Sequence, residues 1–251
     1  MRWPLIIITT LSVTSIFAQT RKEATHVLQN LDGDKRNYDG SIVMNDGSEQ
    51  KGIISYNVRT AILSFNSDAK TGTYSARNVR QFEFFDPELN IDRLFYSMEY
   101  EMPDGGQPAN QFFEIIRQYK DFAVIGKTDP VVFKKKRTAF DVLIVDDVRR
   151  PNTIEVYYTT TFYFVSADLG IQAYLQFQVT DVERINDYIW DIFKDRKERT
   201  RKEILDLQAP KNLMGVHYKQ VVAYARKNRL DWDEVDDLLA ITDYYNSLVD
   251  N

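Results

Sequence analysis

The sequence contains no cysteine, and its two histidines, His26 and His217, stand far apart along the chain. The lack of cysteine excludes a disulfide framework, a thiol nucleophile, zinc sites built on cysteine and lipid attachment through an N-terminal cysteine. A metal site with two histidines would have to join the N-terminus to a distant helix. The alternative places one histidine in a flexible N-terminus and the other on a helix surface. We therefore predict neither a metal nor a cofactor.

The sequence also lacks an excess of positive charge, since 32 lysines and arginines face 37 acidic residues and the formal net charge is −5. The molecule as a whole would thus not attract nucleic acid or an anionic membrane, and we expect no nucleic-acid partner. The glycine motifs that bind phosphates or dinucleotides are absent, as is the GxSxG motif of hydrolases. No catalytic residue is predicted.

The one marked apolar run lies at the N-terminus. Leu5–Val13 follows the positive charge of Arg2, and a small residue, Ala18, precedes Gln19. This order is typical of a secretory signal peptide, cleaved after residue 18. The run is shorter than the roughly 20 residues that a membrane-spanning helix needs, so a permanent anchor is the weaker alternative. We predict an exported protein, periplasmic or secreted, that is soluble after cleavage and has no later transmembrane segment.

Short stretches of alternating apolar and polar residues from about residue 38 to residue 179 predict antiparallel strands. Turns are predicted at Asp39-Gly40, Asp46-Gly47 and Ser67-Asp68. The predicted strands span residues 41–44, 52–56, 61–65, 72–75, 81–85, 93–98, 111–117, 122–126, 139–145, 153–165 and 173–179. The first five, all short, predict a small barrel or curled sheet. The last two predict a long hairpin that turns at Asp168-Leu169-Gly170.

A loop rich in proline and glycine, Pro103–Pro108, marks the predicted boundary between two β regions. The predicted organisation is a signal peptide over residues 1–18, a flexible N-terminus over 19–37, a small β-barrel-like subdomain over 38–102, a second antiparallel β region over 109–180 and a helical tail over 181–251. Whether the two β regions form one domain or two stays open at this point.

From Asp181 onward the apolar period changes from two residues to about 3.6. Apolar stripes over residues 182–193, 218–225 and 238–248 predict about three helices, which pack on one another or on the sheet. Asp231 and Asp233 precede the third stripe, where acidic side chains oppose the positive end of a helix. The predicted fold class is α+β, with an antiparallel β-rich body followed by a C-terminal helical segment.

Several charged clusters invite a functional interpretation. Five acidic residues in the tail suggest a calcium loop at first: Asp231, Asp233, Glu234, Asp236 and Asp237. However, Val235 occupies the fifth position of such a loop, and no glycine occupies the sixth. A charged helix start is favoured. In the same way Asp32 and Asp34, followed by Arg36, favour a solvated turn over a metal site.

Basic clusters lie at Lys194–Lys202, Lys134–Arg137 and Arg149-Arg150. They would suit a phosphate, a lipid anion or an acidic partner. Alternatively they form a solvated helix face and protected sheet edges, or Lys194–Lys202 offsets the acidic start of the third helix.

Tyrosines and acidic residues leave two further alternatives open. A surface for binding sugar or peptide could use four tyrosines of the second β region: Tyr157, Tyr158, Tyr163 and Tyr174. A position in the core suits at least half of them better. A glycosidase would need two carboxylates at a fixed separation, and the sequence indicates no preferred pair.

Three segments carry a resemblance to known proteins. They are the first hairpin, Gly40–Gly52, with the strand at Val79–Phe82; Phe112–Ile115; and Tyr218–Tyr224 together with the ending Tyr244–Leu248. In these segments the sequence resembles a set of uncharacterised exported proteins of Gram-negative bacteria. The resemblance implies location and architecture, and it assigns no activity and no residue role.

Together these observations predict a non-enzymatic protein, exported to the cell envelope or secreted, that acts through protein–protein interaction. Its C-terminal helices are the predicted docking element for another envelope protein. The alternative is a carbohydrate-binding module or a hydrolase with a carboxylate pair in a deep cleft. Binding residues and oligomeric state are not predicted.

Overall fold

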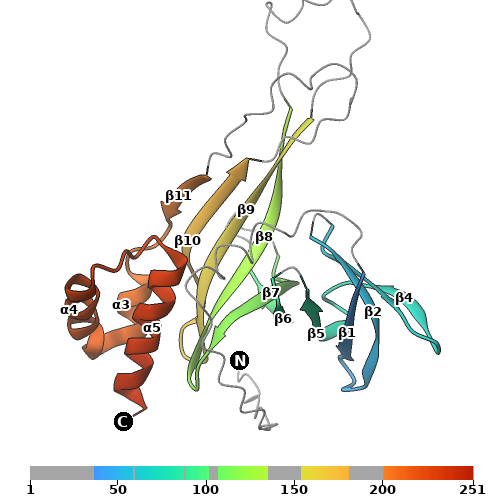
Figure 1. Cartoon of the computed structure of the whole chain (residues 1–251), viewed down its shortest axis with the longest axis horizontal. Coiled ribbons are helices and arrows are strands. Elements are labelled where there is room, and N and C mark those ends of the chain that lie inside the picture. Colours follow the sequence, from blue (N-terminus) through green and yellow to red (C-terminus); the bar gives the residue numbers. More distant parts are fainter. Residues whose placement is uncertain are drawn as a thin grey trace, which may run out of the picture.

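The structure is a computed structural model that describes residues 37–58, 60–87, 89–101, 107–134, 154–180 and 200–250. In these residues eleven strands form one open antiparallel sheet, in the order β11-β10-β9-β8-β7-β6-β5-β1-β2-β3-β4. The C-terminal helices lie at the β11 end of the sheet and the N-terminal strands at the β4 end (Figure 1). A mostly antiparallel β body with a C-terminal helical segment, as predicted, is thus confirmed.

The strands are β1 Tyr38–Met44, β2 Glu49–Asn57, β3 Ile62–Asn66, β4 Thr71–Tyr74, β5 Val79–Asp86, β6 Ile91–Tyr100, β7 Ala109–Gln118, β8 Phe122–Lys134, β9 Ile154–Ser166, β10 Gly170–Thr180 and β11 Thr200–Ile204. The helices are α3 Ala209–Met214, the 3-10 turn η1 Gly215–His217, α4 Tyr218–Asn228 and α5 Val235–Val249. Ten of the eleven predicted strands overlap an observed one. The prediction over residues 139–145 lies outside the described residues, and so does the first predicted helix, 182–193.

Two of the predicted turns depend on a glycine with a positive φ. Gly47, with φ +86°, follows Asp46, whose carboxylate accepts a hydrogen bond from the Ser48 N–H at 2.9 Å, and this turn joins β1 to β2. Gly170, with φ +68°, opens β10 directly opposite Ser166 and closes the long β9–β10 hairpin. L-residues with side chains rarely adopt this conformation, so both turns follow from the sequence.

The turn predicted at Asp39-Gly40 is wrong, because both residues lie inside β1. A Cβ atom on Gly40 would stand 2.2 Å from the backbone oxygen of Glu83 on β5. The glycine therefore permits a close approach of two strands, which is the second common use of glycine in a sheet.

The helical tail predicted over residues 181–251 is wrong at β11, which pairs with β10 from Leu175–Ile204 to Val179–Thr200. In the described part of the tail, two helices are longer than two turns, α4 and α5, and α3 has six residues. The apolar stripes that predict helices do not include residues 200–204, and pairing with β10 satisfies the backbone groups of both strands there.

The N-terminal half of the sheet curls around its own apolar face. Tyr56 on β2 contacts three phenylalanine rings, Phe82 on β5, Phe95 on β6 and Phe112 on β7, with ring centroids 5.0, 5.3 and 5.8 Å away. Since β1, β5 and β6 separate β2 from β7 in the sheet, only strong curling brings these rings together. A closed barrel would need a second neighbour for β4. The barrel-like prediction is therefore corrected to an open, curled sheet.

The C-terminal half of the same face is covered by helices instead. Side chains of β8, β9 and β10 form a core with Ala209 of α3 and with Val235, Leu238 and Leu239 of α5. A separate cluster joins α4 to α3 and α5 through Met214, Val221, Ala225 and Ile241. The ladder from β6 to β7 is continuous from Phe95–Glu114 to Tyr100–Ala109, so the two predicted β regions share one sheet.

Candidate functional site

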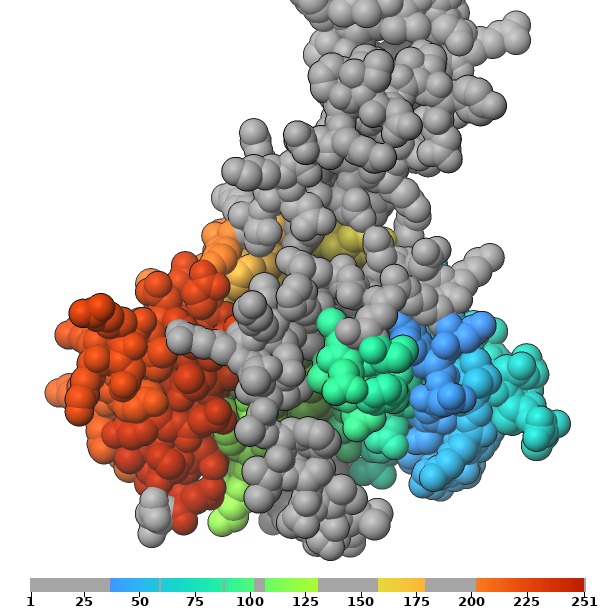
Figure 2. Space-filling model, viewed as in Figure 1, coloured from blue at the N-terminus to red at the C-terminus, as the bar shows by residue number. Residues whose placement is uncertain are grey.

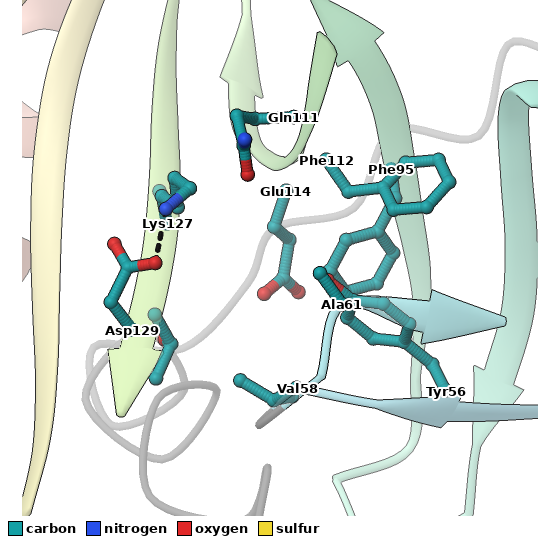
Figure 3. Close-up of a pocket in the computed structure, with 11 residues that line it drawn as sticks. Tyr56, Val58, Ala61, Phe95, Gln111, Phe112, Glu114, Lys127 and Asp129 are labelled. Carbon is teal, nitrogen blue, oxygen red and sulfur yellow. Dashed lines mark hydrogen bonds and ion pairs between the residues drawn. The ribbon is translucent and has the colours of Figure 1, made fainter. Parts of the chain in front are cut away.

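A small hollow lies where the curled half of the sheet meets the helix-covered half (Figure 3). Its lining comes from β2, the turn before β3, and strands β6 to β8: Tyr56, Val58, Ala61, Phe95, Gln111, Phe112, Glu114, Gly126, Lys127, Thr128 and Asp129. The free space is about 20 Å³, which is room for about one water molecule. Three charged side chains of strands line it, Glu114, Lys127 and Asp129.

Glu114 enters the hollow from β7 and is held from behind by Arg93 of β6. The Arg93 Nε and Nη2 atoms donate to the two carboxylate oxygens of Glu114 at 2.8 and 2.7 Å. Asp86 lies 3.6 Å from Nη1, and the three side chains are almost fully buried. Burial alone would lower the pKa of Arg93, but the negative charges of Glu114 and Asp86 raise it overall. Arg93 therefore stays charged and keeps both oxygens of Glu114 engaged.

On β8 a second ion pair lines the hollow. The Lys127 ammonium group contacts Asp129, and Lys127 is buried whereas the Asp129 side chain is 46% exposed. Figure 3 shows Glu114 between this pair and the rings of Phe95 and Phe112. Burial raises the pKa of Tyr56 above its usual range, and the nearby carboxylates of Asp129 and Glu114 add to the effect.

This arrangement does not resemble an acid–base site. Glycoside hydrolysis needs one carboxyl group that donates a proton and one that faces the sugar, with room for the substrate between them. Here the two carboxylates that line the hollow, Glu114 and Asp129, are each paired with a cation, and the hollow holds about one water molecule. Over the described ranges no three side chains of the metal-ligating types gather in one place.

The acidic cluster of the tail forms the start of α5, as predicted. Asp236 and Asp237 lie in the first turn of the helix, and the Asp237 carboxylate accepts a hydrogen bond from the Asp231 N–H at 2.9 Å. His217 lies in η1, half-buried, with its ring 6.3 Å from that of Tyr245. His26, Asp32 and Asp34 fall outside the part of the chain that the structure describes.

Of the basic clusters, one residue has a clear structural role. Lys202 on β11 forms an ion pair with Glu234, the residue that precedes α5, and its ammonium group lies 5.7 Å from the centre of the Phe177 ring. For Lys202 the predicted role of offsetting the acidic helix start is therefore confirmed. Residues 135–137, 149–150 and 194–199 lie outside the described ranges.

The tyrosines proposed for a binding surface differ in how deeply they are buried. Tyr163 and Tyr174 are buried in the core, and the Tyr174 hydroxyl donates to the backbone oxygen of Trp232 at 3.0 Å. Burial raises the pKa of both hydroxyls. Tyr158 is half-buried, and the side chain of Tyr157 is outside the description. A core role is thus confirmed for Tyr163 and Tyr174.

Sequence reasoning did not identify the outward side of α4. In this helix Val221 and Ala225 are buried, and they face α3 and α5 rather than the sheet. The exposed residues are Lys219, Gln220, Ala223, Arg226, Lys227 and Asn228. The sequence did contain a signal for it: Lys219 and Arg226 are seven residues apart on an amphipathic helix, and residues at this spacing share a face. The helices occupy one end of the molecule (Figure 2).

No family model, curated protein or solved structure matches this chain. The resemblance to exported proteins of Gram-negative bacteria stays a prediction. Within the ranges that the structure describes, no helix combines the length and the apolar character that crossing a membrane requires.

Proposed function

We propose that this protein is a non-enzymatic protein, exported to the cell envelope or secreted, whose C-terminal helices bind another protein. One observation carries the proposal: α4 is held through one side, against α3 and α5, and presents its other side outward as a preformed surface. The hollow between the two halves of the sheet offers no comparable surface.

The helices beneath α4 are fixed to the sheet by specific hydrogen bonds. The Tyr119 hydroxyl, next to β7, bonds to the hydroxyl of Thr242 at 2.8 Å and to the carboxylate of Asp243 at 2.7 Å. Within the helical layer, the Tyr245 hydroxyl donates to the backbone oxygen of Leu213 at 3.0 Å. A surface ordered before binding loses less conformational entropy when a partner docks, which favours recognition at this place.

Next to the outward side of α4 lie one exposed apolar residue and a half-buried pair of tyrosines. Val216 in η1, just before α4, is 92% exposed, and the Tyr224 ring stacks on Tyr244 of α5 at 3.9 Å. A polar surface with one exposed apolar side chain and a rigid aromatic pair suits a protein–protein contact.

Site-specific photo-crosslinking in intact cells tests this proposal. A photo-reactive residue at Ala223, in the middle of the outward side of α4, is expected to give one discrete crosslinked protein, identified by mass spectrometry. The matched control carries the same residue at Ser64, which is exposed on β3 at the other end of the sheet. No product at Ala223, or identical products at both positions, would contradict the proposal.

The export part of the proposal has its own test. Mass spectrometry of the native protein is expected to find a mature chain that begins at Gln19. An intact Met1 in most of the protein would contradict export through a cleaved signal peptide.

A further inference from the structure

We infer that the segment bound by α4 is acidic, and that its carboxylates pair with Lys219, Arg226 and Lys227. This inference rests on the proposed function and specifies the chemistry of the partner. It follows from how charges are distributed and used in the helical layer.

The acidic residues of α5 are engaged inside the molecule. Asp237 accepts from the Asp231 N–H, Asp243 accepts from the Tyr119 hydroxyl, and Asp250, just after the helix, accepts from Asn246. These carboxylates stabilise the fold and are less available to a partner.

The cations of α4 are used differently. The helix contains Lys219, Arg226 and Lys227 and no acidic residue, and within the described residues none of these three forms an ion pair. Three exposed positive charges on eleven residues form a local positive field on a chain whose net charge is −5. Because salt screens charges beyond about 10 Å, acidic residues farther away than this add little to the field at α4.

Helix stability explains two of these cations but not the third. Arg226 and Lys227 lie in the last turn of α4, where positive charge is favourable. Lys219 lies in the first turn, where it opposes the positive end of the helix. A lysine at this position costs the helix a little stability, so its use is better explained by an external anion than by the fold.

The spacing of the cations specifies the shape of the acidic segment. Lys219 and Arg226 are seven residues apart, about 10.5 Å along the helix axis and on the same side. Ala223 lies between them, so no long side chain blocks the approach of a partner. Two carboxylates seven residues apart on a helix would match this distance and lie on one side of that helix.

A protein segment fits this surface better than a membrane does. Stable binding to anionic lipid takes clusters of roughly four to eight basic residues or an apolar face that enters the bilayer. The outward side of α4 has three cations, the exposed Arg229 follows directly after the helix, and Ala223 is the one exposed apolar residue of α4. The charge is thus at the lower end of this range, and the helix has no exposed apolar face.

Fluorescence anisotropy with defined probes tests the inference on the full chain. The probe is a labelled helical peptide with glutamates at positions i, i+4 and i+7. Two control peptides carry glutamine at those positions, or the same glutamates spread around the helix. We expect the first peptide to bind about tenfold more tightly than either control and to lose affinity as salt is added.

The matched variants are K219E/R226E/K227E on α4 and K51E/R77E/R80E on exposed positions of the N-terminal half, which change the net charge equally. We expect only the α4 variant to lose binding of the glutamate peptide, by about tenfold or more. Equal loss in both variants, no loss in either, or binding to phosphatidylcholine–phosphatidylglycerol vesicles in place of the peptide would overturn the inference.

The outcome is distinguishable from failure of the proposed function. A crosslink at Ala223 to a partner segment without acidic residues would overturn the acidic chemistry and leave the docking role intact. No crosslink at Ala223 would overturn the docking role itself.

Discussion

The two halves of this sheet cover the same face in different ways. In the N-terminal half, strands β1 to β7 curl until rings from distant strands meet, and the sheet serves as its own cover. In the C-terminal half, strands β8 to β10 rely on α3 and α5 for their cover. One consequence is chemical, because the curled half encloses an ion pair among aromatic rings whereas the helix-covered half is fixed by tyrosine hydroxyls.

The two kinds of cover differ in where they leave room for a binding surface. A curled sheet uses its concave face for its core and leaves a small hollow at its end. A helix-covered sheet has an additional layer, and the outer side of that layer takes no part in the core. In this molecule that additional layer ends in α4.

The largest expected effect concerns the ion pair of the curled half. Arg93→Met leaves Glu114 buried without its cation, and we expect unfolding free energy to fall by about 3–5 kcal/mol. Urea denaturation monitored by circular dichroism measures the loss. The triple variant Arg93→Met, Glu114→Met and Asp86→Asn should recover a large part of it, since all three buried charges are then removed. If Arg93→Met is as stable as the wild type, the Arg93–Glu114 ion pair does not stabilise the curled half of the sheet.

The next largest effect concerns the cover of the other half. Leu238, fully buried, joins α5 to the sheet, and Leu238→Ala should cost about 2–5 kcal/mol. Because the two cores share no residue, hydrogen exchange should accelerate in α4 and α5 more than in β1 and β5. Equal acceleration of hydrogen exchange in both halves would show that they open as one unit, which contradicts two separately stabilised cores.

Alkaline pH should act through two buried tyrosines of the C-terminal half, Tyr163 on β9 and Tyr174 on β10. The pKa of Tyr163 and Tyr174 is raised by burial from the ordinary value of 10.0, so folding favours the neutral hydroxyl. The resulting stability is complete below about pH 10 and is lost as pH rises above it, at about 1.4 kcal/mol per group by pH 11. The absorbance of ionised tyrosine should rise together with unfolding. Tyr163→Phe should reduce the loss of stability at alkaline pH.

The smallest expected effect concerns the exposed ion pair of the tail. Lys202 and Glu234 keep side-chain exposures of 32% and 48%, so Lys202→Met should change stability by less than about 1 kcal/mol. Thermal unfolding of this variant beside Arg93→Met compares an exposed with a buried ion pair in one protein. A loss as large as that of Arg93→Met would mean that β11 and α5 depend on Lys202.

Sequence reasoning located the strands well because their signals are local. The alternation of β9 and β10 and the glycine at position 170 lie within one hairpin, so the chain itself specifies them. The strand β11 could not be found in this way, because its stability comes from pairing with β10. The curl was anticipated only in part, since the contact of Tyr56 with Phe112 depends on the order of five strands.

The candidate sites were predicted less completely for a similar reason. Arg93 and Glu114 stand 21 residues apart and meet only through the register of β6 and β7. The α4 surface was within reach, because the apolar stripe of the helix already implied an opposite, exposed side. What the sequence did not reveal is that the acidic residues of α5 find partners inside the molecule, whereas the cations of α4 form no ion pair with any residue that the structure describes.

The order of the strands also bears on how the chain acquires its fold. Of the ten strand ladders in the described structure, nine join strands that follow each other in sequence, and the exception is β1 with β5. Contacts between neighbours in sequence form rapidly, whereas closing a long loop is slow. The return of β5 to β1, where Gly40 meets Phe84, therefore has the character of a late, rate-limiting step. Gly40 thus bears on the speed of folding as much as on the final packing.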